Sequence, residues 1–374
     1  MFCHLKLGMT MSHAVSTNPK HCKVFLLGTS ALVCLALAAP VMADDFVITG
    51  SDNSTNGTGT TNGGTAAAIA DTAINGSDTV SLGIALTTTG TNVGIKTNNN
   101  DTEAQSNTVT VTGTGSITTT GTSSYGIRNQ GSSNKTTVSG SIKTTGYYAF
   151  GIYNAGDSNE STVSGSITTT GEGGHGIRNQ GSSNKTTVSG SITTTGANGY
   201  GIVNEGDNNT NTITGSIAIS GAIGLGLYNI GDNNTNSITG SITSTGASAT
   251  GVYNYGGGNS TKVSGTITTS GENADGVWSG HGTGTSNTVS VTGSITTTGD
   301  KSSGIEFYGA TNSATISGTI NSSGTDTSAL RNQNGNGNSF QLNEGAIIIG
   351  DILAIGGSTV TNGKLIFNLG EGTS

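Results

Sequence analysis

The sequence predicts an all-β protein, a right-handed parallel β-helix (β-solenoid) built from coils of about 25 residues with three strands each. The first observation behind this prediction is the segment GSITTTG, which stands unchanged at residues 115–121, 165–171, 190–196 and 293–299. Near copies begin at Gly140, Gly215, Gly240, Gly265 and Gly318, and the nine starts are 25 residues apart except for one step of 28. A period of this length indicates stacked units that share one core.

The second observation is that every unit carries three apolar positions. The first is the Ile of GSI: Ile117, Ile142, Ile167, Ile192, Ile217, Ile242, Ile267, Ile295 and Ile320. The second follows a Gly ten residues later: Ile127, Ile152, Ile177, Ile202, Leu227, Val252, Val277, Ile305 and Leu330. The third precedes the next GSI: Val138, Val163, Val188, Ile213, Ile238, Val263, Val291 and Ile316. Alternating Thr, Ser, Val and Ile around these positions, with Gly and Asn between, predict short strands and turns and exclude helical repeats.

The third observation is a column of asparagines two residues after the second apolar position. Strand alternation predicts that these side chains face inward and bond to their copies in the neighbouring coils. Ser279 and Phe307 interrupt the column, and the outward neighbour Arg178 is expected to be an ordinary surface residue. The column consists of Asn129, Asn154, Asn179, Asn204, Asn229, Asn254 and Asn332.

The N-terminus, residues 1–43, is predicted to be a secretory signal peptide. Lys20, His21 and Lys23 precede an apolar run from Val24 to Ala39, and small residues precede a cleavage site after Ala43. The alternative is an uncleaved membrane anchor, for which the run is short; Met1, Met9 and Met11 are alternative starts. Cleavage would remove all three Cys, three of the 13 Lys and Arg and none of the 21 Asp and Glu, so the net charge would move from −8 to −11.

The rest of the chain divides into three predicted parts. Residues 44–82 form an N-terminal cap of degenerate coils, residues 83–345 form the β-helix repeats, and residues 346–374 form a more apolar closing segment. In the last part, Asn362 and Gly363 are expected to form a hairpin turn.

The long signal, the cysteine-free Gly/Ser/Thr/Asn-rich repeat GSITTTGxxxxGIxNxGxxNxxTVS and the closing segment GAIIIGDILAIGGSTVTNGKLIFNLG together resemble the adhesin-type passenger of a bacterial autotransporter. This resemblance implies export through the inner membrane and display at the surface of a Gram-negative bacterium, in the outer membrane or extracellular space. It also implies a C-terminal translocator barrel. The residues after Leu342 are too few to supply the strands of such a barrel. We therefore expect the barrel to lie beyond Ser374.

Composition narrows the function to a non-enzymatic structural or adhesive role without a cofactor. Few and scattered basic residues exclude nucleic acid as a partner. His175 and His281 are expected to be solvated loop residues, since neither has a partner at metal-ligand spacing. A calcium site at Asp157, Asp207 and Asp232 is an alternative, although turns by themselves favour Asp and Asn.

Two other functions remain open. A β-helix enzyme acting on polysaccharides would need charged residues gathered on one groove, and here charges are sparse. An ice-binding solenoid would use outward Thr-x-Thr rows such as Thr118 and Thr120, which Lys143, Ala218 and Asn321 interrupt in other coils.

The candidate interaction site is a stripe at the variable position before the second-strand Gly. Stacked at one coil spacing, its aromatic and apolar groups would offer a binding site for a surface protein or glycan of a host cell or neighbouring cell. The alternative is that this edge packs locally over the corner of the coil. The stripe comprises Tyr125, Phe150, His175, Tyr200 and Leu225, with Tyr147 and Tyr148 beside it.

Export by a Gram-negative host should remove residues 1–43. N-terminal sequencing of the exported protein is then expected to begin at Asp44, and a start far from this residue would contradict the predicted signal peptide.

Overall fold

The computed structural model describes residues 22–27, 31–36, 46–49, 61–64, 79–83, 85–91, 93–98, 106–280, 286–333, 336–355 and 364–367. The chain divides into two compact units, Met1–Ala43 and Asp44–Ser374, at the position of the predicted cleavage. In the first unit, β1 (Cys22–Leu27) and β2 (Ala31–Ala36) pair antiparallel. All secondary structure of the described residues is β-strand or turn, so none of these residues belongs to a helix that could span a membrane.

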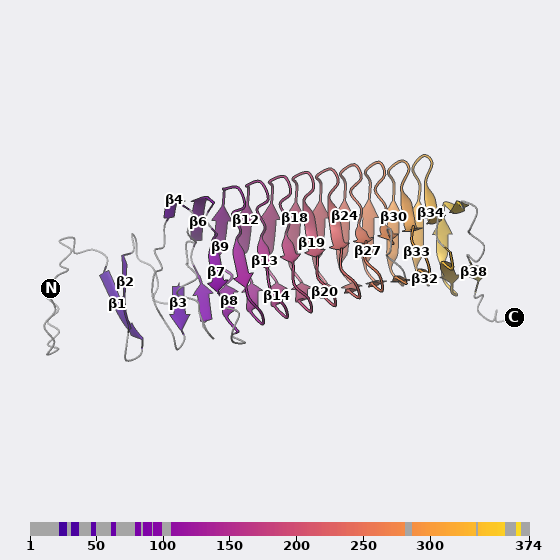
Figure 1. Cartoon of the computed structure of the whole chain (residues 1–374). Helices are drawn as coiled ribbons and strands as arrows, with labels where there is room; N and C mark the ends of the chain where they lie inside the picture. Colours follow the sequence, from indigo (N-terminus) through magenta and orange to yellow (C-terminus); the bar gives the residue numbers. More distant parts are fainter. Residues whose placement is uncertain are drawn as a thin grey trace, which may run out of the picture. The chain divides into compact units, whose positions relative to one another are not determined.

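The second unit is a stack of coils with three parallel sheets (Figure 1). The first sheet holds the GSI strands: β4 (Thr61–Gly64), β6 (Ala85–Gly90), β9 (Ser116–Thr119), β12 (Ser141–Thr144), β15 (Ser166–Thr169), β18 (Ser191–Thr194), β21 (Ser216–Ile219), β24 (Ser241–Ser244), β27 (Thr266–Thr269), β30 (Ser294–Thr297), β33 (Thr319–Ser322) and β36 (Ile347–Ile349). The second sheet holds β7 (Ile95–Asn98), β10 (Ile127–Gln130), β13 (Ile152–Asn154), β16 (Ile177–Asn179), β19 (Tyr200–Asn204), β22 (Leu225–Asn229), β25 (Val252–Asn254), β28 (Val277–Ser279), β31 (Ser303–Phe307), β34 (Ser328–Gln333) and β37 (Asp351–Ile355). The third sheet holds β3 (Phe46–Thr49), β5 (Thr79–Leu82), β8 (Thr108–Val111), β11 (Lys135–Val138), β14 (Glu160–Val163), β17 (Lys185–Val188), β20 (Thr210–Ile213), β23 (Thr235–Ile238), β26 (Ser260–Val263), β29 (Thr288–Val291), β32 (Ser313–Ile316), β35 (Ser339–Leu342) and β38 (Lys364–Phe367).

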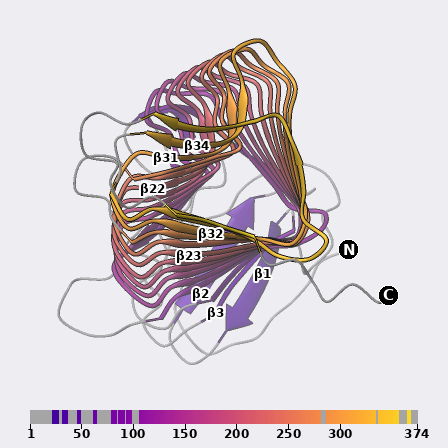
Figure 2. The same ribbon diagram turned by 90° about the vertical axis from the view of Figure 1, so that its right-hand side faces the viewer.

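Each coil passes once through the three sheets, and each strand pairs in parallel with its copy in the next coil (Figure 2). The register matches repeat to repeat, as in the pairing of Ile167 with Ile192 in the first sheet and Ile177 with Ile202 in the second. The predicted parallel β-helix of three-strand coils is therefore confirmed. One strand departs from this pattern: β3, in the predicted cap segment 44–82, pairs antiparallel with β5 at the edge of the third sheet.

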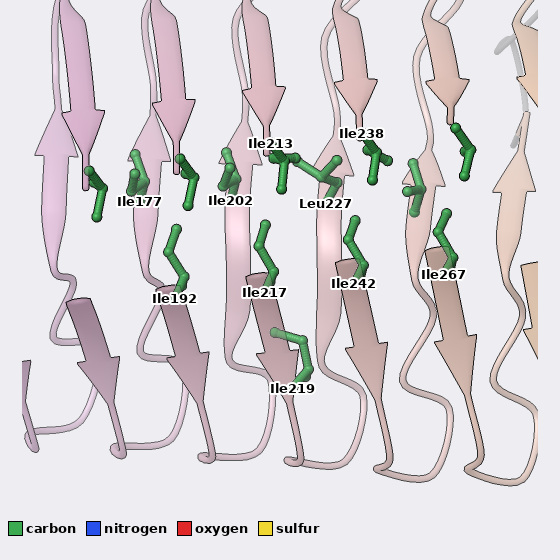
Figure 3. Packing of buried hydrophobic residues seen from close by; sticks show 14 of the residues in the cluster. Ile177, Ile192, Ile202, Ile213, Ile217, Ile219, Leu227, Ile238, Ile242 and Ile267 are labelled. Carbon is green, nitrogen blue, oxygen red and sulfur yellow. The ribbon is translucent and has the colours of Figure 1, made fainter. Parts of the chain in front are cut away.

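The apolar core is formed by the three predicted columns, whose members are at most 1% exposed. Figure 3 shows their side chains pointing from the strands towards a common interior. The Gly before the second apolar position is required by close packing. At Gly176, for example, a Cβ atom would lie 2.3 Å from Cγ2 of Ile192.

Six of the seven asparagines in the predicted column form a continuous ladder of amide hydrogen bonds, whereas Asn332 accepts a bond from the Nδ2 of Asn338 at 2.7 Å. From Asn129 to Asn254, each Nδ2 donates to the Oδ1 of the asparagine one coil on, at 2.7–2.8 Å. The ladder ends where Asn254 donates to the hydroxyl of Ser279 at 3.1 Å. These side chains are fully buried, which confirms the inward orientation.

A second asparagine ladder, which the sequence analysis did not identify, lies at the turn before the third strand. The Oδ1 of each member accepts the backbone N–H of the member one coil earlier, at 2.7–3.2 Å. It continues across the 28-residue coil, because Asn259 bonds to Asn287. Its members are Asn107, Asn134, Asn159, Asn184, Asn209, Asn234, Asn259, Asn287, Asn312 and Asn338.

The closing segment continues the stack, because β36, β37 and β38 pair in parallel with β33, β34 and β35. Ile347 and Ile349 take the outward positions of Thr319 and Asn321, and they are 53% and 50% exposed. The predicted hairpin turn at Asn362 and Gly363 lies outside the described residues.

Replacing Asn179 with Leu should destabilise the protein by about 2–5 kcal/mol. The change removes amide bonds to Asn154 and Asn204 and leaves buried polar groups unpaired. Thr195→Ala, at an exposed position on the same coil, should change the free energy of unfolding by no more than about 0.5 kcal/mol. Denaturant unfolding measures both variants, and equal losses would contradict the ladder's role.

Candidate functional site

Two rows of side chains run side by side on the outer side of the second sheet. The corner row is the variable position before the second-strand Gly, and the middle row is the outward position between the second apolar residue and the Asn ladder. The corner row consists of Tyr125, Phe150, His175, Tyr200, Leu225, Thr250, Asp275 and Ser303. The middle row consists of Arg128, Tyr153, Arg178, Val203, Tyr228, Tyr253, Trp278, Glu306 and Arg331.

Four rings of the corner row stack face to face along the coils. The centroid distances are 4.9 Å from Tyr125 to Phe150, 4.8 Å from Phe150 to His175 and 4.6 Å from His175 to Tyr200, with interplanar angles of 12°, 4° and 4°. The sequence analysis expected this stacking at one coil spacing. For three members the alternative of local packing holds, since Phe150 is 1%, His175 8% and Leu225 6% exposed. These three residues pack over the corner, whereas Tyr147 and Tyr148 beside them are 48% and 46% exposed.

His175 is a buried member of this stack, so the expectation of a solvated loop histidine is wrong. Its Nδ1 accepts a hydrogen bond from the backbone N–H of Tyr200 at 3.2 Å, which places the ring proton on Nε2. Burial, with a smaller contribution from the Arg178 charge, lowers the pKa of His175 to about 3. The ring of His175 is therefore neutral at physiological pH. The other histidine considered in the sequence analysis, His281, lies outside the described residues.

Arg178 faces outward as predicted, but it is not an ordinary surface residue. Its guanidinium lies 2.6 Å from the carboxylate of Glu205 and over the rings of Phe150 and Tyr153, 5.3 and 5.4 Å from their centroids. A planar cation in this position covers the aromatic stack and ties it to the next coil.

Further along the coils the aromatic side chains move from the corner row to the middle row. Tyr200 contacts Tyr228 edge to face at 5.5 Å, Tyr228 stacks on Tyr253 at 5.1 Å, and Tyr253 meets Trp278 at 4.1 Å. The corner row is small over the same coils, with Leu225, Thr250 and Asp275. A groove of about 390 Å³ results, and the aromatic rings form one of its walls.

An acidic pair lies at the far end of this groove. Asp275 accepts the backbone N–H of Ser303 at 2.6 Å, and Glu306 accepts the hydroxyl of Ser303 at 3.2 Å. Arg331 approaches Glu306 to 3.4 Å. Burial raises the pKa of both carboxyls, and the Glu306 charge raises that of Asp275 further. The sequence analysis named no residue of this cluster as a site, although Asp275 and Trp278 are one coil from Ser303 and Glu306 and the register brings them together.

The three aspartates considered for calcium have another role in the described structure. Asp157, Asp207 and Asp232 each accept, through Oδ1, a backbone N–H one coil on, at 2.7 Å. Among the described residues no group of three or more His, Cys, Asp and Glu is arranged to hold a metal ion. On the first sheet, Thr119 is buried while Thr118 and Thr120 face outward, as the sequence predicts.

Comparisons with known proteins add no assignment: no protein-family model, no curated protein and no solved structure matches this chain.

Acid should destabilise the protein through His175. Because its pKa is about 3 in the folded state and 6.5 when unperturbed, protons bind preferentially to the unfolded chain below pH 6.5. The neutral ring makes its full contribution to the free energy of unfolding above pH 6.5. As the pH falls from 6.5 to about 3, this contribution decreases by about 1.4 kcal/mol for each pH unit.

His175→Phe, which copies Phe150 one coil earlier, should remove this loss. Denaturant unfolding of the unchanged protein and of the variant at pH 7, 6 and 5 measures the loss of stability with acid. Asp275 and Glu306 titrate in both proteins, so their contributions cancel when the two free energies of unfolding are subtracted. Parallel pH curves would show that His175 is not a buried neutral ring.

Proposed function

We propose that this chain is the passenger part of an autotransporter-like protein, exported and displayed at or released from the surface of a Gram-negative bacterium. Its role is adhesion to a surface protein or glycan of a host cell or a neighbouring cell, without enzymatic activity. The parallel β-solenoid is the fold that this proposal requires, and it supports no single function by itself.

One observation carries the adhesive role: an unbroken chain of ring contacts on one side of the solenoid. Aromatic residues make up only 5% of the sequence, yet the rings follow one another from coil to coil along the corner and middle rows. After Tyr200 the contacts continue through Tyr228, Tyr253 and Trp278 to Tyr308. Aromatic side chains supply most hot-spot energy in recognition surfaces, and the other sheets present mainly Ser and Thr outward.

A polysaccharide-acting enzyme is the second candidate, favoured by Asp275 and Glu306. A pair of carboxyls with raised pKa values beside a groove is the equipment of a general acid and base. The adhesive proposal expects no new reducing ends when the full chain is incubated with neutral or acidic polysaccharides. Their release, abolished by Asp275→Asn, would establish the enzyme instead.

The double variant Tyr147→Thr, Tyr148→Ser tests the adhesive stripe. It gives this coil the residues of the preceding one, Thr122 and Ser123, and Ser123 has the same left-handed backbone as Tyr148, with φ of 52° against 51°. Stability should therefore change by no more than about 0.5 kcal/mol, whereas binding should fall about tenfold or more if these exposed rings contact the partner.

Binding of the purified full chain to cultured animal cells and to bacteria, followed by flow cytometry, provides the measurement. Lys143→Thr, an exposed change on the first sheet that copies Thr118, is the matched control and should bind normally. Normal binding by the double variant would remove Tyr147 and Tyr148 from the site. Absence of binding to both cell types by the unchanged protein would remove the adhesive role.

A further inference from the structure

The groove beside the acidic pair has the form of a site for an extended ligand. Its lining runs from the coil of Tyr200 to the coil of Arg331, five steps in the second sheet and roughly 24 Å at about 4.8 Å per coil. Leu225 and Thr250 lie low in the groove because they are 6% and 7% exposed. Such a length suits a linear chain that follows the solenoid axis better than a compact small molecule.

The two sides of the groove differ in chemistry. Tyr228, Tyr253 and Trp278 offer apolar ring atoms with phenol and indole polar groups. The lining also includes residues of the turn before the second strand, among them Ser248 and Asn273. Apolar surface interleaved with hydroxyl and amide groups matches a sugar ring, which carries C–H and O–H groups together.

Ile223 adds an exposed apolar side chain to the rim of the groove. It has a φ of 57° and is 54% exposed, and this left-handed backbone is a true outlier for a β-branched residue. The same turn position has a positive φ in every coil from Ser123 to Asp326, so this conformation belongs to the repeat. Among these residues Ile223 is the β-branched one, and its exposed side chain lies where a ligand in the groove can contact it.

The charges in the groove favour a cationic ligand. The groove is lined by Asp275, Glu306, Arg331 and Lys301, and Lys301 is bound to Glu272 at 2.6 Å. Burial raises the pKa of both carboxyls, and an ammonium group beside them would favour their ionised form, because opposite charges interact strongly in a poorly solvated place. The acidic cluster would repel uronic or sialic acids and attract an ammonium group.

We infer that this groove binds a linear glycan whose hexosamine units carry free amino groups, with an ammonium against the Asp275–Glu306 pair and sugar rings along Tyr228, Tyr253 and Trp278. This deepens the proposed adhesive function and rests on it. A lysine-rich peptide is the competing cation. It is disfavoured because each strand from β19 to β34 is already paired on both sides and leaves no backbone edge for an extended peptide.

The single tryptophan of the chain makes the test direct. Trp278 is the only Trp in the sequence and lines the groove, so tryptophan fluorescence of the full-length protein, excited at a wavelength that the nine tyrosines do not absorb, reports on this site. The titrants are β-1,4-linked tetraglucosamine, its fully N-acetylated form and cellotetraose, which share a backbone and differ at C2. Saturable binding of tetraglucosamine, at least about tenfold tighter than the other two, is expected, since only it offers a charged hydrogen-bond donor.

Three variants locate the ligand. Asp275→Asn should weaken tetraglucosamine binding about 10- to 100-fold, the loss expected for a hydrogen bond to a charged group. Thr250→Tyr, which copies Tyr200 in the corner row, should block the groove without changing its charge. Ile223→Asn should weaken binding while it raises the melting temperature, a combination that a purely structural residue would not give.

Asp157→Asn is the matched control, because it removes one charge from an exposed turn and keeps the Oδ1 acceptor. Equal affinity for the N-acetylated form, normal binding by a folded Asp275→Asn or Thr250→Tyr variant, or preference for tetralysine would each overturn the inference. Adhesion to cells without tetraglucosamine binding would refute this inference alone, whereas tetraglucosamine binding without adhesion would refute the proposed function.

Discussion

The structure depends on one constraint: each buried asparagine must find hydrogen-bond partners, and the ladders supply one of them one coil away. Asn154 donates to Asn179 and also to Ser161 in the third strand of its own coil, so the two inward columns are coupled. Towards the C-terminal end the third-strand column becomes apolar at Val289, and Phe307 replaces the asparagine and stacks on Phe340 at 4.8 Å. Asn332, which pairs with Phe307 in the sheet, bonds to Asn338 instead, because an unpaired buried amide would cost about 1–3 kcal/mol. The identity of inward residues is therefore set by the neighbouring coil.

This constraint explains why the core could be predicted from the sequence. The GSI isoleucines and the column containing Asn179 repeat at the coil period, and an inward position that must match its neighbour repeats visibly. The ladder containing Asn184 repeats equally well. It was missed because Asn in a turn already has a local explanation, and its real partner is a backbone N–H, which no side-chain pattern reveals.

The outward rows could be predicted only in part, for the opposite reason. Their residues vary from coil to coil, so the surface that they form depends on contacts between side chains of different types. The stack from Tyr125 to Tyr200 was found because rings follow one another at one position. The groove was not, because it arises where Thr250 is small in one row and Tyr253 is large in the other. The charge of Arg178 gave no hint that its guanidinium lies over two rings.

The inward and outward rows have different roles, for the same physical reason. The ladders and apolar columns hold the backbone of every coil in one geometry, so an outward side chain can change without disturbing the register. A surface on such a scaffold can be assembled one coil at a time: aromatic stacking over the coils from Tyr125 to Tyr200, then an open groove that ends at Asp275 and Glu306. Ile223 shows the limit of this variation. A β-branched side chain is strained at a turn position where the repeat requires a positive φ, here 57°. Recognition in this protein should therefore be sought where the outward rows vary most from coil to coil.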